Sequence, residues 1–294
     1  MASWLRVLAS RTGSAAPRIR SARQIHGAGE EVRLNRLQGA HQGVAEVVMN
    51  RPAARNALGT TFVNQMSSVV EGLRHDDQLR VVLFKSELQG VFCAGADLKE
   101  RAQMDPSEVE LFVHGLRALM SEIAQLPMPT IAAIDGYALG GGLELALACD
   151  IRTAAFSAKL GLIETSRGLL PGAGGTQRLP RTIGLSQAKE LIFTGRQIDG
   201  QQAAGLGLVN KAVAQNDAGD AAYQEALLLA SEILPQAPVA VRMAKRALTG
   251  GSQVDLATGL AIEGMCYAQV IPTLDRLEGM AAFMEKRPPR FSGR

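Results

Sequence analysis

The sequence predicts an α/β fold, in which helices cover β-sheets, followed by a purely helical C-terminal segment. Short runs rich in β-branched residues alternate with stretches whose apolar residues recur at helical spacing. Glycine-rich turns separate several of these elements, and from about Asp220 the strands stop while the helical spacing continues. With 47% hydrophobic and 20% charged residues in 294, the chain has the composition of a globular protein with a large core.

The first half of the chain carries the alternation. The runs Val44–Met49 and Arg80–Lys85 are predicted strands, and the apolar spacing between them predicts a helix from Thr60 to about Arg74. A second helix is expected from Glu108 to Ala124, because two prolines follow closely and would end it. The apolar run Thr130–Ile134 predicts a buried strand ahead of an Asp-Gly turn.

The second half ends in helices. The last strand is expected within Leu208–Val213, and the division between core and helical segment is placed between residues 219 and 220. Residues 29–219 then form the core, and residues 220–294 form a segment too small to fold alone that packs on the core or on a neighbouring subunit. Helices are expected over Tyr223–Ile233, Pro238–Leu248, Leu256–Tyr267 and Thr273–Phe283.

The basic charge of the chain belongs to its first residues. Residues 1–28 hold five of the 31 Lys and Arg residues and none of the 28 acids, so the remainder has a net charge of −2. An acid-free, arginine- and serine-bearing, amphipathic start is typical of a mitochondrial transit peptide, and a disordered basic tail is the alternative. The remainder has no electrostatic reason to bind nucleic acid or anionic lipid.

Several classes of site lack support in the sequence. The three cysteines are widely spaced and the four histidines are isolated, which fits neither a disulfide framework nor a metal site. The sequence contains no G-x-G-x-x-G, no G-x-x-x-x-G-K-[ST] and no G-x-S-x-G. The longest apolar stretch, Ile131–Ile151, is interrupted by three acids and is expected to be a buried segment rather than a membrane span.

The segment Gly140–Asp150 is the first that indicates chemistry. Its three glycines follow a predicted strand and open a helix, so backbone N–H groups at the helix start are left without acceptors, a setting that suits a developing oxyanion. Glu144 is the only charge in the first turns of an otherwise apolar helix, so its carboxylate should be dehydrated and its pKa raised. The alternative is that Glu144 only complements the helix start.

Two further segments share this character. Glu164 ends the apolar run that begins at Leu160, beside a glycine-rich turn, and it either forms an acid/base pair with Glu144 or caps the next helix. In Phe92–Lys99, small residues after a strand suggest exposed N–H groups, while an ordinary loop capped by Asp97 is the alternative.

Together these segments resemble the enoyl-CoA hydratase/isomerase (crotonase) superfamily. The matching stretches occur in the family's order from residue 50 to residue 287: NRPAARNAL (50–58), FCAGADLKE (92–100), DGYALGGGLELALACD (135–150), GLLPGAGGTQRLP (168–180) and DRLEGMAAFMEKR (275–287). The resemblance implies a core built as a spiral of ββα turns. It also implies C-terminal helices that build homotrimers, usually paired into hexamers.

The resemblance also assigns roles to residues. It implies an acyl-CoA whose thioester oxygen lies between the backbone N–H groups of Ala96 and Gly141, with Glu144 and Glu164 as the two hydratase carboxylates. The CoA moiety would lie along Ala96, Asp97, Leu98 and Lys99, with Arg51 and Lys286 as candidate contacts for its phosphates. If the chain threads as the family does, Met104, Leu116 and Leu169 line the acyl pocket. No metal and no separate cofactor is implied, because coenzyme A is part of the substrate.

Retention of both glutamates favours hydration of a trans-2-enoyl-CoA, since relatives that isomerise double bonds generally keep only the second. The resemblance thus implies an enoyl-CoA hydratase of fatty-acid or branched-chain acyl-CoA metabolism in the mitochondrial matrix. A methylglutaconyl-CoA hydratase, an isomerase, a decarboxylase and a scaffold remain alternatives. RNA binding, known for one relative with a lysine-rich helix, is not expected, because Ala57–Leu73 contains no lysine or arginine.

Overall fold

The computed structural model describes residues 29–294, so the transit peptide predicted over residues 1–28 lies outside the described residues. Two β-sheets form the centre of the protein, one of six strands and one of four. The larger has the order β1-β2-β3-β5-β7-β10, and the smaller has the order β4-β6-β8-β9. Each of the pairs β3–β4, β5–β6 and β7–β8 gives one strand to each sheet before a helix follows, which confirms the predicted spiral of ββα turns.

The larger sheet is parallel except at its first strand. β1 pairs antiparallel with β2, and every later pair in this sheet is parallel. Its strands are β1 (Val32–Arg36), β2 (Val44–Met49), β3 (Val81–Ser86), β5 (Thr130–Ile134), β7 (Ile151–Ala155) and β10 (Lys211–Val213). The predicted strands at 44–49 and 130–134 are confirmed, the one at 80–85 is displaced by one residue, and the last strand lies at the end of the range predicted for it.

The smaller sheet was not predicted, because its strands are only two or three residues long and carry no period of their own. Its strands are β4 (Val91–Cys93), β6 (Tyr137–Leu139), β8 (Lys159–Gly161) and β9 (Ile198–Asp199). β4, β6 and β8 run parallel to one another, and β9 closes the sheet antiparallel to β8. Three parallel strands therefore end at the same edge of this sheet.

Helices pack on both faces of the larger sheet. α1 (Thr60–Arg74) buries Phe62, Met66 and Val70 in the main core, while α8 (Ala221–Ile233) covers the other face through Ala226 and Ala230. The remaining helices of the body are α2 (Leu98–Arg101), α3 (Pro106–Ala124), α4 (Gly141–Ala148), α5 (Gly175–Ile183), α6 (Leu185–Thr194) and α7 (Gly200–Gly205), with short 3₁₀ turns at Gly39–His41, Pro52–Ala54 and Glu164–Arg167. The second predicted helix begins at Pro106 rather than Glu108, because Asp105 and Glu108 form a capping box.

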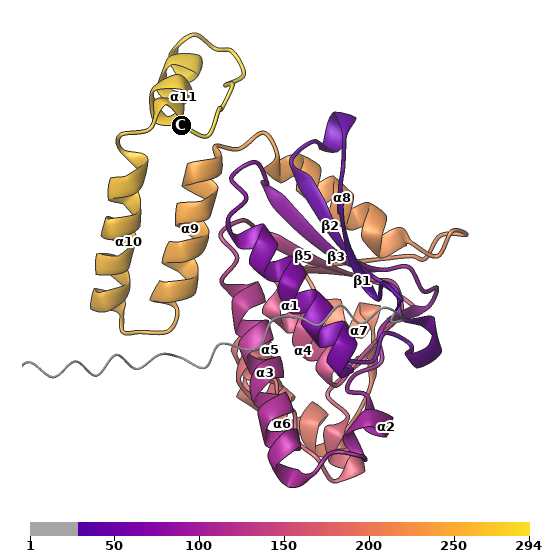
Figure 1. Ribbon diagram of the computed structural model, residues 1–294. Coiled ribbons are helices and arrows are strands. Elements are labelled where there is room, and N and C mark those ends of the chain that lie inside the picture. Colours follow the sequence, from indigo (N-terminus) through magenta and orange to yellow (C-terminus); the bar gives the residue numbers. More distant parts are fainter. Residues whose placement is uncertain (1–28) are drawn as a thin grey trace, which may run out of the picture.

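The last helices form an arm beside the body (Figure 1). α9 (Pro238–Gly251) and α10 (Leu256–Val270) lie side by side, and α11 (Leu274–Met284) packs at their end. α9 buries no side chain fully and α10 buries only Cys266, although both are rich in apolar residues. Within residues 29–294 no single helix has the length and hydropathy to cross a membrane. α8 and α9 pass that test only as a pair, which bends by 112°.

Candidate active site

The residues singled out from the sequence meet where β4, β6 and β8 end. Ala96 follows β4, Gly141 and Glu144 follow β6, and Glu164 follows β8. Because the three strands are parallel neighbours, their carboxyl ends lie at one edge, and the segments that follow them converge there. The chain thus brings together four residues that are separated by as many as 68 positions.

Two backbone N–H groups at this edge have no acceptor. Among residues 29–294 neither Ala96 nor Gly141 donates a backbone hydrogen bond, although the bonds of their neighbours Leu58, Asp97 and Glu144 are all present. Gly141 is the first residue of α4, where N–H groups have no partner inside the helix. We call these two groups the amide pair.

Gly95 allows the two loops that carry the amide pair to approach each other. Its φ is +105°, a left-handed conformation, and a Cβ there would lie 2.8 Å from the Leu139 carbonyl oxygen. The same Cβ position is only 3.6 Å from the Gly141 nitrogen. A side chain at residue 95 would therefore force apart the strand ends that hold the amide pair.

Glu144 lies in the first turn of α4 and is 3% exposed, as predicted from its apolar neighbours. Its Oε1 accepts hydrogen bonds from the backbone N–H groups of Ala173 and Gly175, at 2.8 and 2.7 Å. Burial raises the pKa of Glu144, and these two donors oppose that rise. Since one oxygen is held by backbone donors, the other is the one available for chemistry.

Glu164 begins the 3₁₀ turn that follows β8, and its side chain reaches the same place. Its Oε2 is buried without a hydrogen-bond donor among residues 29–294, and its Oε1 would lie 3.1 Å from a Cβ on Gly140. Burial, with a further contribution from the negative charge of Glu144, raises the pKa of Glu164 to about 7. The negative charge of Glu144 thus adds to the effect of burial on Glu164.

The carboxylates and the amide pair open into one cleft of about 570 Å³, which we call the central cleft. Much of its wall is apolar: Leu98, Val109, Val113, Leu116, Ile163, Leu169 and Leu170 line it, and Arg101, Arg117 and Arg167 add positive charge. Of the residues expected to line an acyl pocket, Leu116 and Leu169 do so and Met104 does not.

The residues predicted to contact CoA divide into two groups. Leu98 lines the central cleft beside Ala96, and Lys99 follows it on α2. Asp97 does not line the cleft: its side chain accepts hydrogen bonds from the N–H groups of Lys99 and Glu100, as in the alternative that made it a helix cap. The Asp97 carboxylate therefore serves as the N-cap of α2.

The structure gives Arg51 and Lys286 other surroundings. Arg51 Nη1 lies 2.9 Å from Asp97 Oδ2, its Nε lies 2.9 Å from Glu31, and its Nη2 lies 3.1 Å from Glu100. This guanidinium holds the loop of Ala96 and does not line the central cleft. Lys286 follows α11 on the arm, and no described residue that lines the cleft comes after Ala173.

Sequence reasoning missed Arg101 and the role of the Ala173–Gly175 turn. The turn supplies the two N–H donors to Glu144, and the only signal for it was a glycine-rich stretch ahead of a helix. Arg101 is one of several arginines in the sequence and gave no signal, because its place in the cleft depends on how α2 packs. Within residues 29–294 no group of three His, Cys, Asp or Glu side chains could hold a metal ion.

The arrangement is suited to acid/base chemistry next to a carbonyl group. The N–H groups of the amide pair can stabilise an oxyanion, and two carboxyl groups with raised pKa can take up and release protons. Both functions lie in one cleft with an apolar wall, where such interactions are stronger than in water.

Comparison with known proteins identifies the family of the chain. The sequence profile of the family described as "Enoyl-CoA hydratase/isomerase" matches residues 39–294. The chain is 66% identical over 266 residues to the mitochondrial enoyl-CoA hydratase domain-containing protein 2 of Bos taurus, covering 90% of each. It is 56% identical over 264 residues to the human mitochondrial methylglutaconyl-CoA hydratase, covering 90% of this chain and 78% of that protein.

Among solved structures, an enoyl-CoA hydratase from Bacillus anthracis superposes with a TM-score of 0.85 at 44% sequence identity. The superposition covers 90% of this chain and 100% of the bacterial one.

Proposed function

Since the chain belongs to the enoyl-CoA hydratase/isomerase family, we propose that it adds water across the 2,3 double bond of a trans-2-enoyl-CoA thioester. The observation that carries this proposal is the presence of two carboxyl groups, Glu144 and Glu164, in one cleft with the amide pair. An isomerase needs one group to move a proton between two carbons. Hydration needs both a group that takes a proton from water and one that supplies a proton to carbon.

In the proposed reaction the thioester oxygen accepts hydrogen bonds from the N–H groups of Ala96 and Gly141. Charge drawn toward that oxygen leaves C3 electron-poor, and the amide pair stabilises the enolate that forms when C3 is attacked. One such donor is worth about 3–4 kcal/mol of barrier. The amide pair is complementary to the enolate more than to the neutral thioester, so its contribution acts on the barrier.

Glu144 and Glu164 then move the protons. One carboxylate takes a proton from the water molecule as its oxygen bonds to C3, and the other carboxyl group gives its proton to C2. Hydrogen and hydroxyl are thus added, and the pair returns to a single shared proton. The raised pKa of Glu164 fits the group that carries this proton, since burial and the charge of Glu144 both favour its neutral form.

Coenzyme A needs a path out of the cleft. We place its thioester end along Ala96, Leu98 and Lys99, where exposed residues of α2 follow the cleft wall. Arg51 serves this site indirectly, by fixing Asp97. Lys286 would reach a phosphate of CoA only from the arm of a neighbouring subunit, because no part of the arm lines the cleft of its own chain.

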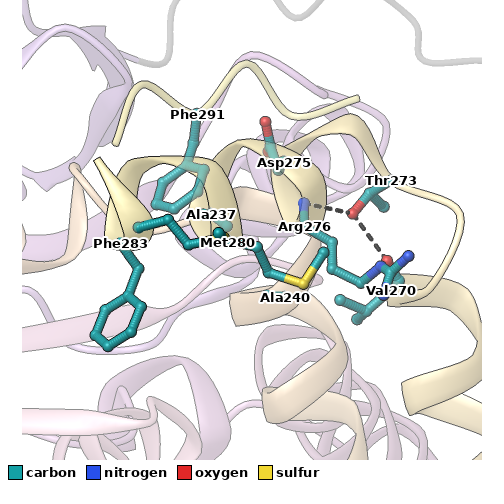
Figure 2. A pocket seen from close by; sticks show the side chains of 11 residues that line it. Ala237, Ala240, Val270, Thr273, Asp275, Arg276, Met280, Phe283 and Phe291 are labelled. Atoms are coloured by element: carbon teal, nitrogen blue, oxygen red, sulfur yellow. Dashed lines mark hydrogen bonds between the residues drawn. The ribbon is translucent and has the colours of Figure 1, made fainter. Parts of the chain in front are cut away.

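Self-association is proposed for the arm. α9, α10 and α11 expose Leu248, Leu256, Leu260, Met265, Tyr267, Leu277, Phe283 and Met284. Figure 2 shows the end of this surface, where Met280, Phe283 and Phe291 line a hollow of about 520 Å³ beside α11. Apolar surface of this extent fits a homotrimer or hexamer, as the resemblance implied, and sedimentation equilibrium would measure the stoichiometry.

The proposed location is the mitochondrial matrix. Relatives with 66% and 56% identity are named as mitochondrial proteins, and residues 1–28 have the composition of a transit peptide. Import of the full chain into isolated mitochondria, with recovery of a shortened and protease-protected product, would test both proposals.

The decisive experiment follows loss of the conjugated thioester in crotonyl-CoA. Wild-type protein should hydrate it, and Glu144→Gln and Glu164→Gln should each lower kcat by about 10²–10⁴. A decarboxylase would instead release carbon dioxide from a malonyl-type thioester, and an isomerase would move a double bond without consuming water. Unchanged turnover in both variants would refute the acid/base assignment.

A further inference from the structure

Arg178 lies next to the turn that binds Glu144, outside the central cleft. It is the fourth residue of α5, and it does not line the cleft. Its Nη1 donates a hydrogen bond to the Ala173 carbonyl oxygen at 3.1 Å, while the N–H group of Ala173 donates to Glu144 at 2.8 Å. Ala173 is therefore bound to the carboxylate through its N–H group and to the guanidinium through its carbonyl oxygen.

Two glycines of this turn leave room for the charged groups. A Cβ on Gly174 would meet Arg178 Nη1, and the φ of Gly174 is +111°, a conformation that other residues rarely adopt. A Cβ on Gly175 would lie 3.0 Å from Glu144 Oε1. The guanidinium and the carboxylate thus each pack against the backbone of one of two adjacent residues.

The position of Arg178 in α5 is unfavourable by itself. The start of a helix carries partial positive charge, so a cation at the end of the first turn is repelled. Burial lowers the pKa of Arg178, and the negative charge of Glu144 opposes this effect. Within residues 29–294 the two side chains form no direct ion pair. Arg178 therefore acts on the carboxylate across the intervening turn.

Several groups determine the charge of Glu144. Burial raises its pKa, the two N–H donors of the turn oppose this rise, and the positive charges of Arg178 and Arg101 add to their effect. Glu164 adds a negative charge to the same cleft, and Arg117 of α3 donates to a carbonyl oxygen just ahead of the turn. Arg178 differs from Arg101 because it also holds the turn that supplies the N–H donors.

We propose that Arg178 is a positioning residue for hydration: it fixes the Ala173–Gly175 turn, and through this turn it holds Glu144 as the carboxylate that takes the proton from water. This inference rests on the proposed function. A carboxylate that accepts N–H bonds and lies near a cation stays in its charged form, which a general base requires. The buried Oε2 of Glu164 has no donor among residues 29–294, which suits the group that carries the proton for C2.

The test is the pH dependence of kcat/KM for crotonyl-CoA in wild type, Arg178→Met and Arg178→Lys. The wild-type profile should rise with pH as Glu144 loses its proton and fall as Glu164 loses its own. In Arg178→Met the rising limb should move to higher pH by about 0.5–1 pH unit, because the charged form of Glu144 loses a cation and its donors are held less firmly. Lysine restores the charge, so Arg178→Lys should return most of this shift.

Arg181→Met is the matched control. Arg181 lies on the same helix and donates to the Gln177 carbonyl oxygen at 2.7 Å, but its side chain is exposed. Removing this charge should leave the rising limb within about 0.2 pH unit of wild type, since solvent screens it from the cleft.

A double variant separates action through Glu144 from a general loss of structure. In the Glu144→Gln background no carboxylate remains to be held in its charged form. Adding Arg178→Met to Glu144→Gln should therefore change the residual kcat/KM by less than about threefold. If Arg178 only stabilised the fold, the two losses of activity would multiply.

Three outcomes would overturn the proposal: a fall in kcat/KM with no movement of the rising limb in Arg178→Met, an equal movement in Arg181→Met, or multiplied losses in the double variant. If Arg178→Met does not fold, Arg178→Gln takes its place, and the same movement of the limb is expected. These results would leave the proposed hydration intact. A wild-type protein that does not hydrate crotonyl-CoA would refute the proposed function and the role of Arg178 with it.

Discussion

Replacing Glu164 by glutamine should remove activity and at the same time stabilise the fold above neutral pH. The pKa of Glu164 is raised from 4.5 to about 7 because the folded protein buries the carboxyl group beside Glu144. The folded state therefore binds this proton more tightly than the unfolded state does. By linkage, the free energy of unfolding must fall as pH rises from about 4.5 to about 7.

The size of the effect follows from the same values. A pKa raised from 4.5 to about 7 corresponds to at most about 3 kcal/mol of destabilisation once the carboxylate is ionised in both states. The side chain is only partly buried, so solvent screening reduces this to about 1–2 kcal/mol. Glutamine has nearly the same shape as glutamate and does not ionise, so the free energy of unfolding of the variant should not fall in this way as pH rises.

Urea unfolding at pH 5 and at pH 8 measures the prediction directly. The stability of Glu164→Gln relative to wild type should increase by about 1–2 kcal/mol between the two pH values. The control is the Glu110→Gln variant, because Glu110 lies on the exposed face of α3. The difference in stability between this variant and wild type should be the same at both pH values. If the Glu164→Gln protein is no more stable than wild type at pH 8, the ionised Glu164 does not destabilise the fold, and the raised pKa assigned to it is wrong.

Three further predictions concern the same site. Glu144→Gln should lower kcat for crotonyl-CoA by about 10²–10⁴ with little change in KM, measured by loss of the conjugated thioester; an effect on KM alone would contradict its role in proton transfer. Gly95→Ala should lower kcat by about 10²–10³, because its Cβ would meet the Leu139 carbonyl oxygen and displace the amide pair; retained activity in a folded variant would contradict that geometry. Arg51→Met should lower the free energy of unfolding by about 2 kcal/mol or more and should also lower kcat, because it leaves the carboxylates of Glu31, Asp97 and Glu100 without their cation. If only the KM for CoA thioesters rises, Arg51 contacts CoA instead.

The sequence was informative where a residue stands out from its neighbours. Glu144 is a lone acid in an apolar helix, and burial with a raised pKa follows from that contrast alone. The Thr60–Arg74 helix and the 130–134 strand were predicted with the bounds that the structure shows, because each is long or apolar enough to display its period.

The sequence did not predict features that depend on contacts between residues far apart in the chain. The strands of the smaller sheet are too short to show alternation, and they form because the longer strands bring them side by side. Arg51 was expected to contact phosphate, but Glu31, Asp97 and Glu100 approach it only in the folded chain.

Placing the reactive groups behind three separate short strands makes activity a sensitive reporter of partial unfolding. No single segment of the chain holds all of the reactive groups. The smaller sheet, which aligns the segments that carry them, has few backbone hydrogen bonds between its strands. With so few backbone bonds, this sheet is expected to open locally at a lower free energy than the larger one. Activity should therefore be lost at a lower denaturant concentration than the helical circular dichroism signal. A bound thioester contacts several of the loops at once, so it should bring the midpoint of activity loss closer to the midpoint of helix unfolding.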